Sequence, residues 1–188
     1  LLPQAPVTRG VDQEGWLPKT AWPPTFLGEE YRTKPTGHDS LWKLEGSELR
    51  CLSAQLPVQG GQLLSVGERL LLLGSEGLRH GLNENDFVYT VDTETGALSL
   101  LRAEEENMYS SVGSDCRYGG GEPCQVRGED VFHLTTRWGD SHLYRLSPDG
   151  SSHPVITEHG SIDCFAVSPE TDTVLLVAMY DCKLQELY

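Results

Sequence analysis

The sequence predicts an all-β fold, a partial β-propeller of about three to four four-stranded antiparallel blades. From Ser40 onward, short apolar runs alternate with turn-forming residues, and a more apolar pair of strands precedes the polar hairpins. In addition, no helical periodicity of useful length runs through the 188 residues. A β-sandwich also has many short strands, but it does not predict this recurring order of apolar pair and polar hairpin.

Three hairpins share one design. They are "LWKLEGSELRCL" at 41–52, "FVYTVDTETGALSLL" at 87–101 and "HLYRLSPDGSSHPVI" at 142–156. In the third hairpin, Pro148 suits the second position of a type I turn, and Gly150 suits the left-handed position after it. Because one motif occurs three times, we interpret it as the outer half of a repeated blade.

Apolar strand pairs precede the second and third hairpins. We expect them within 62–74 and 124–136, and a further pair within 162–180, before a fourth hairpin that begins with "KLQELY" at 183–188. The inner strands of a propeller are the more apolar ones, because both of their faces contact neighbouring blades. These pairs are therefore predicted to form the inner halves of the blades.

The repeat length fits a propeller. Alignment of the third strands brings Leu41, Val88, Leu143 and Leu184 into register, at intervals of 47, 55 and 41 residues. Four-stranded blades repeat at roughly 40 to 50 residues. The longer middle interval contains the glycine-rich stretch 111–121, so we expect an insertion there between the outer strand of one blade and the inner strand of the next.

The organisation of the chain changes near residue 40. Residues 1–39 hold six of the eleven prolines and show no period, which predicts an irregular segment or part of a preceding blade. Residues 40–188 are predicted to be consecutive blades. An arc of so few blades would expose the faces of its terminal blades, so we expect a fragment truncated at both ends, with exposed edges that permit self-association.

The chain is strongly acidic. It has 14 Lys and Arg against 28 Asp and Glu, a formal net charge of −14. This balance argues against nucleic acid and against an anionic membrane surface as partners. The longest apolar run, "RLLLLG" at 69–74, is too short to cross a bilayer, and no signal peptide is visible. We expect a cytoplasmic protein.

The cysteines do not form a metal-binding pattern. Their number is odd and no pair has the spacing C-x-x-C, so we expect no metal site and no cofactor. The main interpretation is reduced thiols in an intracellular protein. A Cys116–Cys124 disulfide that closes the glycine-rich loop is the alternative. The remaining cysteines are Cys51, Cys164 and Cys182.

The glycine-rich stretch "SVGSDCRYGGG" at 111–121 does not fit a phosphate-binding loop. Such a loop requires G-x-x-x-x-G-K-[ST], or G-x-G-x-x-G at the start of a helix, so that backbone amides converge on the anion. Here Glu122 and Pro123 follow the glycines, and they place an acid and a residue without an N–H where amide donors are needed. We interpret the stretch as a corner between two blades.

Several stretches carry a family resemblance. They are the glycine-rich loop with Ser114, Asp115 and Arg117, the strand "SHLYRL", the strand "GSIDCFAV" and the final "LQELY". Together they resemble the N-terminal propeller of the prolyl oligopeptidase family of serine peptidases, in particular its acylaminoacyl-peptidase-like branch. The resemblance is good from about residue 84 to 188, fair from 40 to 83 and absent from 1 to 39.

The resemblance implies a two-part enzyme. A propeller would cover the active site and admit only peptides, and a C-terminal α/β-hydrolase domain would carry a Ser-Asp-His triad with its Ser in G-x-S-x-G. In this chain "GDSHL" and "GSSHP" lack the second glycine and lie in hairpins. None of the six histidines has a Ser and an acid in suitable order, and His133 is expected to be a half-buried structural residue. We therefore assign no catalytic residue, and whether the parent is an enzyme depends on the hydrolase domain.

Two functions are compatible with these patterns. The first is the non-catalytic, gating and substrate-selecting propeller portion of a serine oligopeptidase, with the hydrolase domain of the parent chain and short peptides as partners. There Asp115 and Arg117 would contact a substrate carboxylate or an interdomain acid, or else only stiffen their loop. The second is a stand-alone β-propeller protein-binding module, with Trp42, Trp138 and Tyr144 as anchors.

Overall fold

A computed structural model describes residues 39–80, 84–102, 107–108 and 124–188. Within these ranges every regular secondary-structure element is a β-strand, as the sequence predicts. Two expectations concern residues outside these ranges, the one for residues 1–39, of which only Asp39 is described, and the one for the stretch 111–121.

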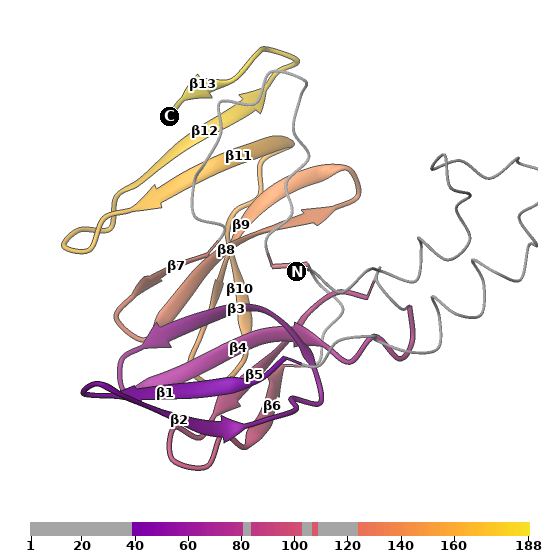
Figure 1. Cartoon of the computed structure of the whole chain (residues 1–188). Helices are drawn as coiled ribbons and strands as arrows, with labels where there is room; N and C mark the ends of the chain where they lie inside the picture. The colour runs from indigo at the N-terminus through magenta and orange to yellow at the C-terminus, as the bar shows by residue number, and fades with distance from the viewer. Residues whose placement is uncertain (1–38, 81–83, 103–106, 109–123) are drawn as a thin grey trace, which may run out of the picture.

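The strands group into four successive units, which we call blades 1 to 4 (Figure 1). Blade 1 contains β1 (Leu41–Glu45) and β2 (Glu48–Ser53). Blade 2 contains β3 (Gln59–Val66), β4 (Arg69–Ser75), β5 (Phe87–Val91) and β6 (Leu98–Arg102). Blade 3 contains β7 (Cys124–Arg127), β8 (Asp130–Arg137), β9 (Asp140–Leu146) and β10 (Ser152–Ile156). Blade 4 contains β11 (Gly160–Val167), β12 (Val174–Tyr180) and β13 (Glu186–Leu187).

Each blade is an antiparallel meander. Blades 2 and 3 each have four strands in chain order, and blades 1 and 4 show two and three strands among the described residues. One parallel pair, Ser161 with Ser141, joins β11 to β9 and merges the strands of blades 3 and 4 into a seven-stranded sheet. The chain therefore forms a partial propeller, which confirms the predicted fold class.

The three predicted hairpins are present, as β1–β2, β5–β6 and β9–β10. Their turns place Gly46, Gly96 and Gly150 at positive φ, where a residue without a Cβ is favoured. In the third turn the Gly150 amide donates to the Ser147 carbonyl at 2.9 Å, which is the i to i+3 bond of the turn that the position of Pro148 predicts.

The fourth aligned position differs from the prediction. Leu184 lies in the connection between β12 and β13, and it is 72 % exposed instead of belonging to a third strand. The strand starts later because Asp181 and Cys182 both adopt positive φ in a tight turn, closed by a 3.0 Å bond from the Lys183 amide to the Tyr180 carbonyl. Pairing with β12 then begins only at Glu186.

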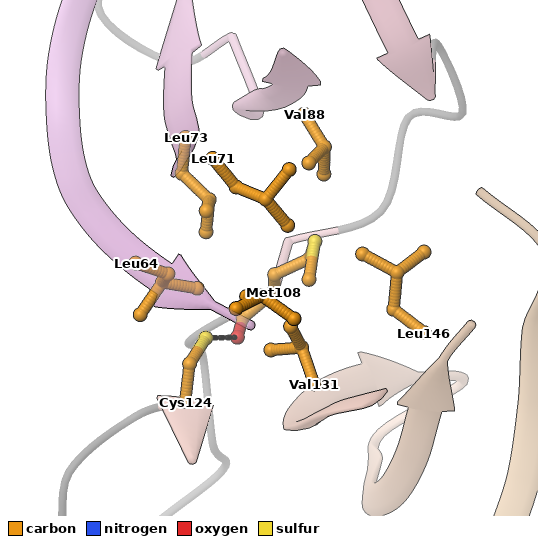
Figure 2. Close-up of a cluster of buried hydrophobic side chains, with 9 residues drawn as sticks. Leu64, Leu71, Leu73, Val88, Met108, Cys124, Val131 and Leu146 are labelled. Atoms are coloured by element: carbon orange, nitrogen blue, oxygen red, sulfur yellow. Dashed lines mark hydrogen bonds between the residues drawn. The ribbon is translucent and has the colours of Figure 1, made fainter. Parts of the chain in front are cut away.

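The hydrophobic core lies between the blades. Figure 2 shows the cluster between blades 2 and 3, in which Leu71 and Val88 face Val131 and Leu146. Similar clusters fill the other two interfaces, so the second strands β4 and β8 are covered on both faces, whereas β3 exposes Leu63 and β7 exposes Val126. The interface of blades 1 and 2 contains Leu41, Leu56, Val58, Leu72, Tyr89 and Val91, and that of blades 3 and 4 contains Phe132, Leu134, Leu143, Ile162, Phe165, Leu176 and Ala178.

Glycine turns dock onto the preceding blade. A Cβ added at Gly150 would lie 2.6 Å from the Leu101 carbonyl oxygen of β6, and one at Gly96 would lie 2.8 Å from Leu52 of β2. The Arg102 guanidinium also donates to the Gly150 carbonyl at 3.0 Å. The third-to-fourth-strand turn of a blade thus packs on the fourth strand of the blade before it, in two successive interfaces.

Blades 3 and 4 are joined differently. The side-chain amide of Gln125 on β7 donates to the Phe165 carbonyl at 2.7 Å and accepts from the Val167 amide at 2.9 Å. It thus bonds to the backbone of β11 in the way that the backbone of a neighbouring strand would. Arg127 donates to the Thr171 carbonyl at 3.0 Å. These bonds fix the inner strands of the two blades to each other.

The two ends of the blades differ. At one end lie the connections between first and second and between third and fourth strands, as the contacts of Arg69 with Pro148 and of Arg127 with Thr171 show. We call this the turn end. At the other end lie the second-to-third connections and the links between blades, which the bond from His159 to Asp140 brings together. We call this the loop end.

Candidate functional site

The sequence-predicted contact residues Asp115 and Arg117, and Cys116 beside them, lie outside the described residues. The described residues on either side of the segment 109–123 lie in the core. Met108 and Cys124 are buried in the core between blades 2 and 3, and the Cys124 thiol donates to the Met108 carbonyl at 3.4 Å (Figure 2). The described chain therefore stops at Met108 and resumes at Cys124 within one part of the core.

The Cys124 thiol is buried in the core and has a structural role. Burial raises its pKa to about 12, because a thiolate would lack water around its charge. The thiol is therefore protonated at neutral pH and is a poor nucleophile. Because Cys116 is outside the described residues, the Cys116–Cys124 disulfide stays a prediction.

A polar cluster at the loop end joins blades 3 and 4. His159 donates from Nδ1 to Asp140 Oδ2 at 2.7 Å, and His142 Nε2 lies 3.9 Å from the same oxygen. The hydrogen bond from His159 lowers the pKa of Asp140. The intervening Ser141 is fully buried, and its hydroxyl donates to the Ile162 carbonyl at 3.1 Å. The cluster holds an acid and imidazoles without an available serine, so it fixes two connections instead of forming a triad.

A second group brings a serine, an acid and a histidine together at the turn end. The Ser151 hydroxyl donates to Asp149 Oδ1 at 2.5 Å and lies 2.9 Å from His153 Nε2. In an acyl-transfer triad the histidine lies between the serine and the acid, and accepts the serine proton. Here the serine lies in the middle and its proton is directed at the carboxylate. His153 can then only donate to Ser151, and the group stabilises a turn.

His133 is more buried than expected. Its side chain is 1 % exposed on β8, where it stacks on Tyr144 with ring centroids 6.2 Å apart. Burial lowers its pKa to about 4, so the ring is neutral at physiological pH. The expectation of a half-buried residue was wrong because the strand alternation gives the face of a residue but not the number of layers that cover it. The burial agrees with the prediction that His133 has a structural role.

The three proposed anchors of a binding module divide into two classes. Trp42 and Trp138 are 54 % and 103 % exposed, so both are accessible to a partner. Tyr144 is buried and lies under the guanidinium of Arg137, with 4.9 Å between the Arg137 carbon and the ring centroid. Tyr144 is therefore not an anchor, because its neighbours on blade 3 cover it.

Three further features of the described residues concern metal ligands, a surface hollow and membrane spans. No group of three or more His, Cys, Asp or Glu side chains in the described part of the chain is arranged to hold a metal ion. A hollow of about 420 Å³ lies between the start of β1 and the inner strands of blade 2, lined by Asp39, Leu41, Leu56, Gly61, Leu63 and Leu72 among others. Among the same described residues, no helix is long and apolar enough to cross a membrane.

Sequence reasoning missed one arrangement. The second-to-third-strand connections of blades 2, 3 and 4 each expose a large apolar side chain, namely Leu78, Trp138 and Leu184. The signal was present in the sequence, because each of these residues has an Arg or a Lys beside it, as "LR", "RW" and "KL". Only the strand boundaries show that the three occupy equivalent places in the repeat.

Comparison with known proteins supports the fold. No protein-family model matches the chain, and no curated protein matches it. The chain is similar to the β-propeller domain of the trilobed protease from Pyrococcus furiosus, with 17% identity, a TM-score of 0.52, and 79% of this chain and 41% of that chain covered. It is also similar to Pyrococcus horikoshii acylaminoacyl peptidase, with 17% identity, a TM-score of 0.55, and 80% and 21% covered.

These similarities define the class of the protein. The described chain has the fold of β-propeller domains, and two of the solved structures that match it are a protease propeller domain and an acylaminoacyl peptidase. The chain spans about two fifths of the first and one fifth of the second. At this identity the comparison shows the β-propeller fold alone.

Proposed function

We propose that this chain is the propeller portion of a serine peptidase of the prolyl oligopeptidase family, in its acylaminoacyl-peptidase-like branch. In this function it controls which substrates reach an α/β-hydrolase domain in the parent chain. The observation that carries the proposal is the succession of blades that superposes, over four fifths of the chain, on an acylaminoacyl peptidase. The sequence resemblance of residues 84–188 to the same branch supports it independently.

The packing of the blades suits a selecting role. An extended peptide needs a much narrower passage than a globular domain. A propeller can therefore admit peptides and exclude folded proteins, provided that its blades do not separate and widen the passage. The interfaces here combine apolar clusters with bonds that cross between blades, such as those of Gln125 and Arg102. A fixed entrance of this kind also keeps bulk water away from the chemistry.

The polar groups of the described residues support a non-catalytic role. The Ser151 group has its serine in the middle, and Ser141 beside Asp140 and His142 is buried and bonded to a carbonyl. The Ser151 proton is directed at Asp149 and the Ser141 proton at the Ile162 carbonyl, so neither is directed at a histidine. The nucleophile, base and acid are therefore proposed to belong to the hydrolase domain, and the parent protein is proposed to act on short peptides in the cytoplasm.

The parent polypeptide tests this proposal. It should encode G-x-S-x-G followed by Asp and His beyond Tyr188, and the purified protein should hydrolyse short blocked peptides but not a folded protein that contains the same sequence. Substitution of the G-x-S-x-G serine by Ala should abolish the hydrolysis. A parent without a hydrolase domain would contradict the proposal and favour the stand-alone binding module, for which the exposed Trp42 and Trp138 are candidate anchors.

Arg117 provides a finer test in the same enzyme. If its guanidinium binds a substrate carboxylate, Arg117→Ala should raise KM for peptides with a free C-terminus about tenfold or more, since a charge-assisted bidentate pair is lost. Peptides with an amidated C-terminus are the control and should be unaffected. Equal kcat/KM values for wild type and variant on both peptides would eliminate a substrate role for Arg117.

A further inference from the structure

We propose that the interface between blades 2 and 3 binds a small cluster of ordered water molecules on the side chains of His133, Thr135 and His142. The waters complete the hydrogen bonds of these three residues and bridge them to one another. The site lies inside the propeller, so it does not depend on the peptidase function proposed above.

The first support is a group of buried polar atoms on blade 3. Both ring nitrogens of His133 and of His142 and the hydroxyl of Thr135 are shielded from solvent, and none of these five atoms meets a partner in hydrogen-bond geometry among the described residues. His133 and Thr135 are 1 % and 0 % exposed. Because native proteins leave few buried polar groups without a partner, five such atoms on three neighbouring residues indicate a bound ligand.

The strand register places the three side chains on one face of blade 3. Thr135 on β8 pairs with His142 on β9, and His133 pairs with Tyr144 two positions further along the same ladder. The face is the one turned to blade 2, since Val131 on the same side of β8 belongs to the cluster between blades 2 and 3. Paired residues have Cβ atoms about 4.5 to 5.5 Å apart, and residues two apart on a strand are separated by roughly 7 Å. A water that makes about three hydrogen bonds can bridge side chains at these separations.

The other blades have residues without polar side-chain atoms at the places of His133 and Thr135. The corresponding residues, which occupy the same positions in the pairing of second and third strands, are Leu72 and Gly74 in blade 2 and Leu176 and Ala178 in blade 4. The packing of the repeat therefore does not require polar side chains here. The polar set is particular to blade 3 and needs a local explanation.

The surroundings disfavour a metal ion as the ligand. Within the described ranges, no third His, Cys, Asp or Glu joins the two imidazoles in an arrangement that could hold a metal. Burial, and to a smaller degree the charge of the Arg102 guanidinium, lowers the pKa of His133 to about 4. The same guanidinium would repel a metal cation next to His133.

A neutral ligand fits better than an anion. The Asp140 carboxylate lies 3.9 Å from His142 Nε2 and would repel an anion bound there. A neutral imidazole offers one N–H and one bare nitrogen, and the Thr135 hydroxyl both donates and accepts. Such a set suits a small molecule that also donates and accepts. Because the five atoms are shielded from solvent, water is the ligand of the right size.

A crystal structure of the full parent protein, at a resolution that shows ordered water, tests the proposal. We expect water density at about 2.7 to 3.2 Å from the Thr135 hydroxyl and from a ring nitrogen of His133 or His142. Protein atoms bonded to these groups in place of water, from any part of the chain, would overturn the proposal. A metal ion at the site, or an interface in which the five polar atoms contact only carbon, would do the same.

Thr135→Val distinguishes a hydrated cluster from a dry one by the sign of its effect. Valine keeps the shape of the side chain and replaces the hydroxyl by a methyl group. A dry interface predicts unchanged or higher stability, because an unsatisfied hydroxyl is removed. If water is bound, it loses a partner, and we expect the equilibrium constant for unfolding to rise about fivefold or more. A constant in urea unfolding that is unchanged or smaller would contradict the hydrated cluster.

Ser141→Ala is the matched control. Its hydroxyl is also buried and is next to His142 in sequence, but it already donates to the Ile162 carbonyl at 3.1 Å. In crystals of the full parent protein, Ser141→Ala should leave the water density at His142 in place, whereas Thr135→Val should lose at least one of the waters. Retention of every water in Thr135→Val would show that the hydroxyl holds none of them and would refute the bridged cluster.

Discussion

The interface between blades 2 and 3 and the interface between blades 3 and 4 are built on the same repeat but held by different polar contacts. Both have an apolar cluster between inner strands. The first adds a glycine turn on β6, bonded by Arg102, whereas the second adds the Gln125 amide and a parallel strand pair. The comparison teaches that the apolar pattern comes from the repeat, while the polar contacts are particular to each junction.

The largest loss of folding stability is expected at low pH, when His133 becomes protonated. This residue lies on the face of blade 3 that packs against blade 2. Its folded pKa is about 4, below an ordinary value of 6.5, so the unfolded chain binds the proton more readily. Stability is therefore complete above about pH 6.5 and is lost as the pH falls towards 4, by about 3 kcal/mol. Urea unfolding at several pH values measures this loss.

His133→Phe is the matched variant for that experiment. It keeps an aromatic ring against Tyr144 but cannot be protonated. The free energy of unfolding should therefore fall less steeply between pH 6.5 and 4, because the contribution of the imidazole is gone. An unchanged slope would show that other groups control the acid sensitivity.

Next in size is the glycine turn of the same interface. Gly150→Ala should destabilise the protein by about 2 to 3 kcal/mol, because φ is +84° and the new Cβ would meet the Leu101 carbonyl. Gly128→Ala is the control, since it has a φ of +62° with nothing within 4 Å, and should cost only about 1 kcal/mol. Equal losses in thermal unfolding would mean that the turn does not dock on blade 2.

The smallest of the three effects is expected at the junction of blades 3 and 4. Gln125→Ala leaves the Phe165 carbonyl and the Val167 amide without their side-chain partner, which should cost about 1 to 2 kcal/mol. Amide hydrogen exchange at Val167 should accelerate while that of β4 in blade 2 stays slow. Equal acceleration in both blades would indicate global destabilisation instead of a local junction.

The blade order and the hairpins were predictable because they depend on local signals. Alternation sets the faces of a strand, and residues such as Pro148 and Gly150 set the turn, so neighbours in sequence carry the information. The start of β13 was not predictable in this way. Asp181 and Cys182 occupy a turn that usually contains Asn and Gly, and the aligned position of Leu184 moved out of the strand.

The site was less predictable than the fold because its contacts join distant parts of the chain. The burial of His133 and Tyr144 depends on their packing against neighbouring elements, and the bond of Asp140 to His159 depends on the approach of blade 4. The exposure of Trp138 was consistent with its proposal as an anchor, but its positive φ of 54° was visible only in the structure.

The short distance between Met108 and Cys124 has a consequence for how such proteins diversify. Because Met108 and Cys124 meet in the core between blades 2 and 3, the number of residues between them can change without moving either blade. A doubling of loop length costs only about 0.6 kcal/mol of closure entropy. A change in the number of residues between Met108 and Cys124 is thus expected to leave stability almost constant, while the blades on either side remain under the constraint of packing.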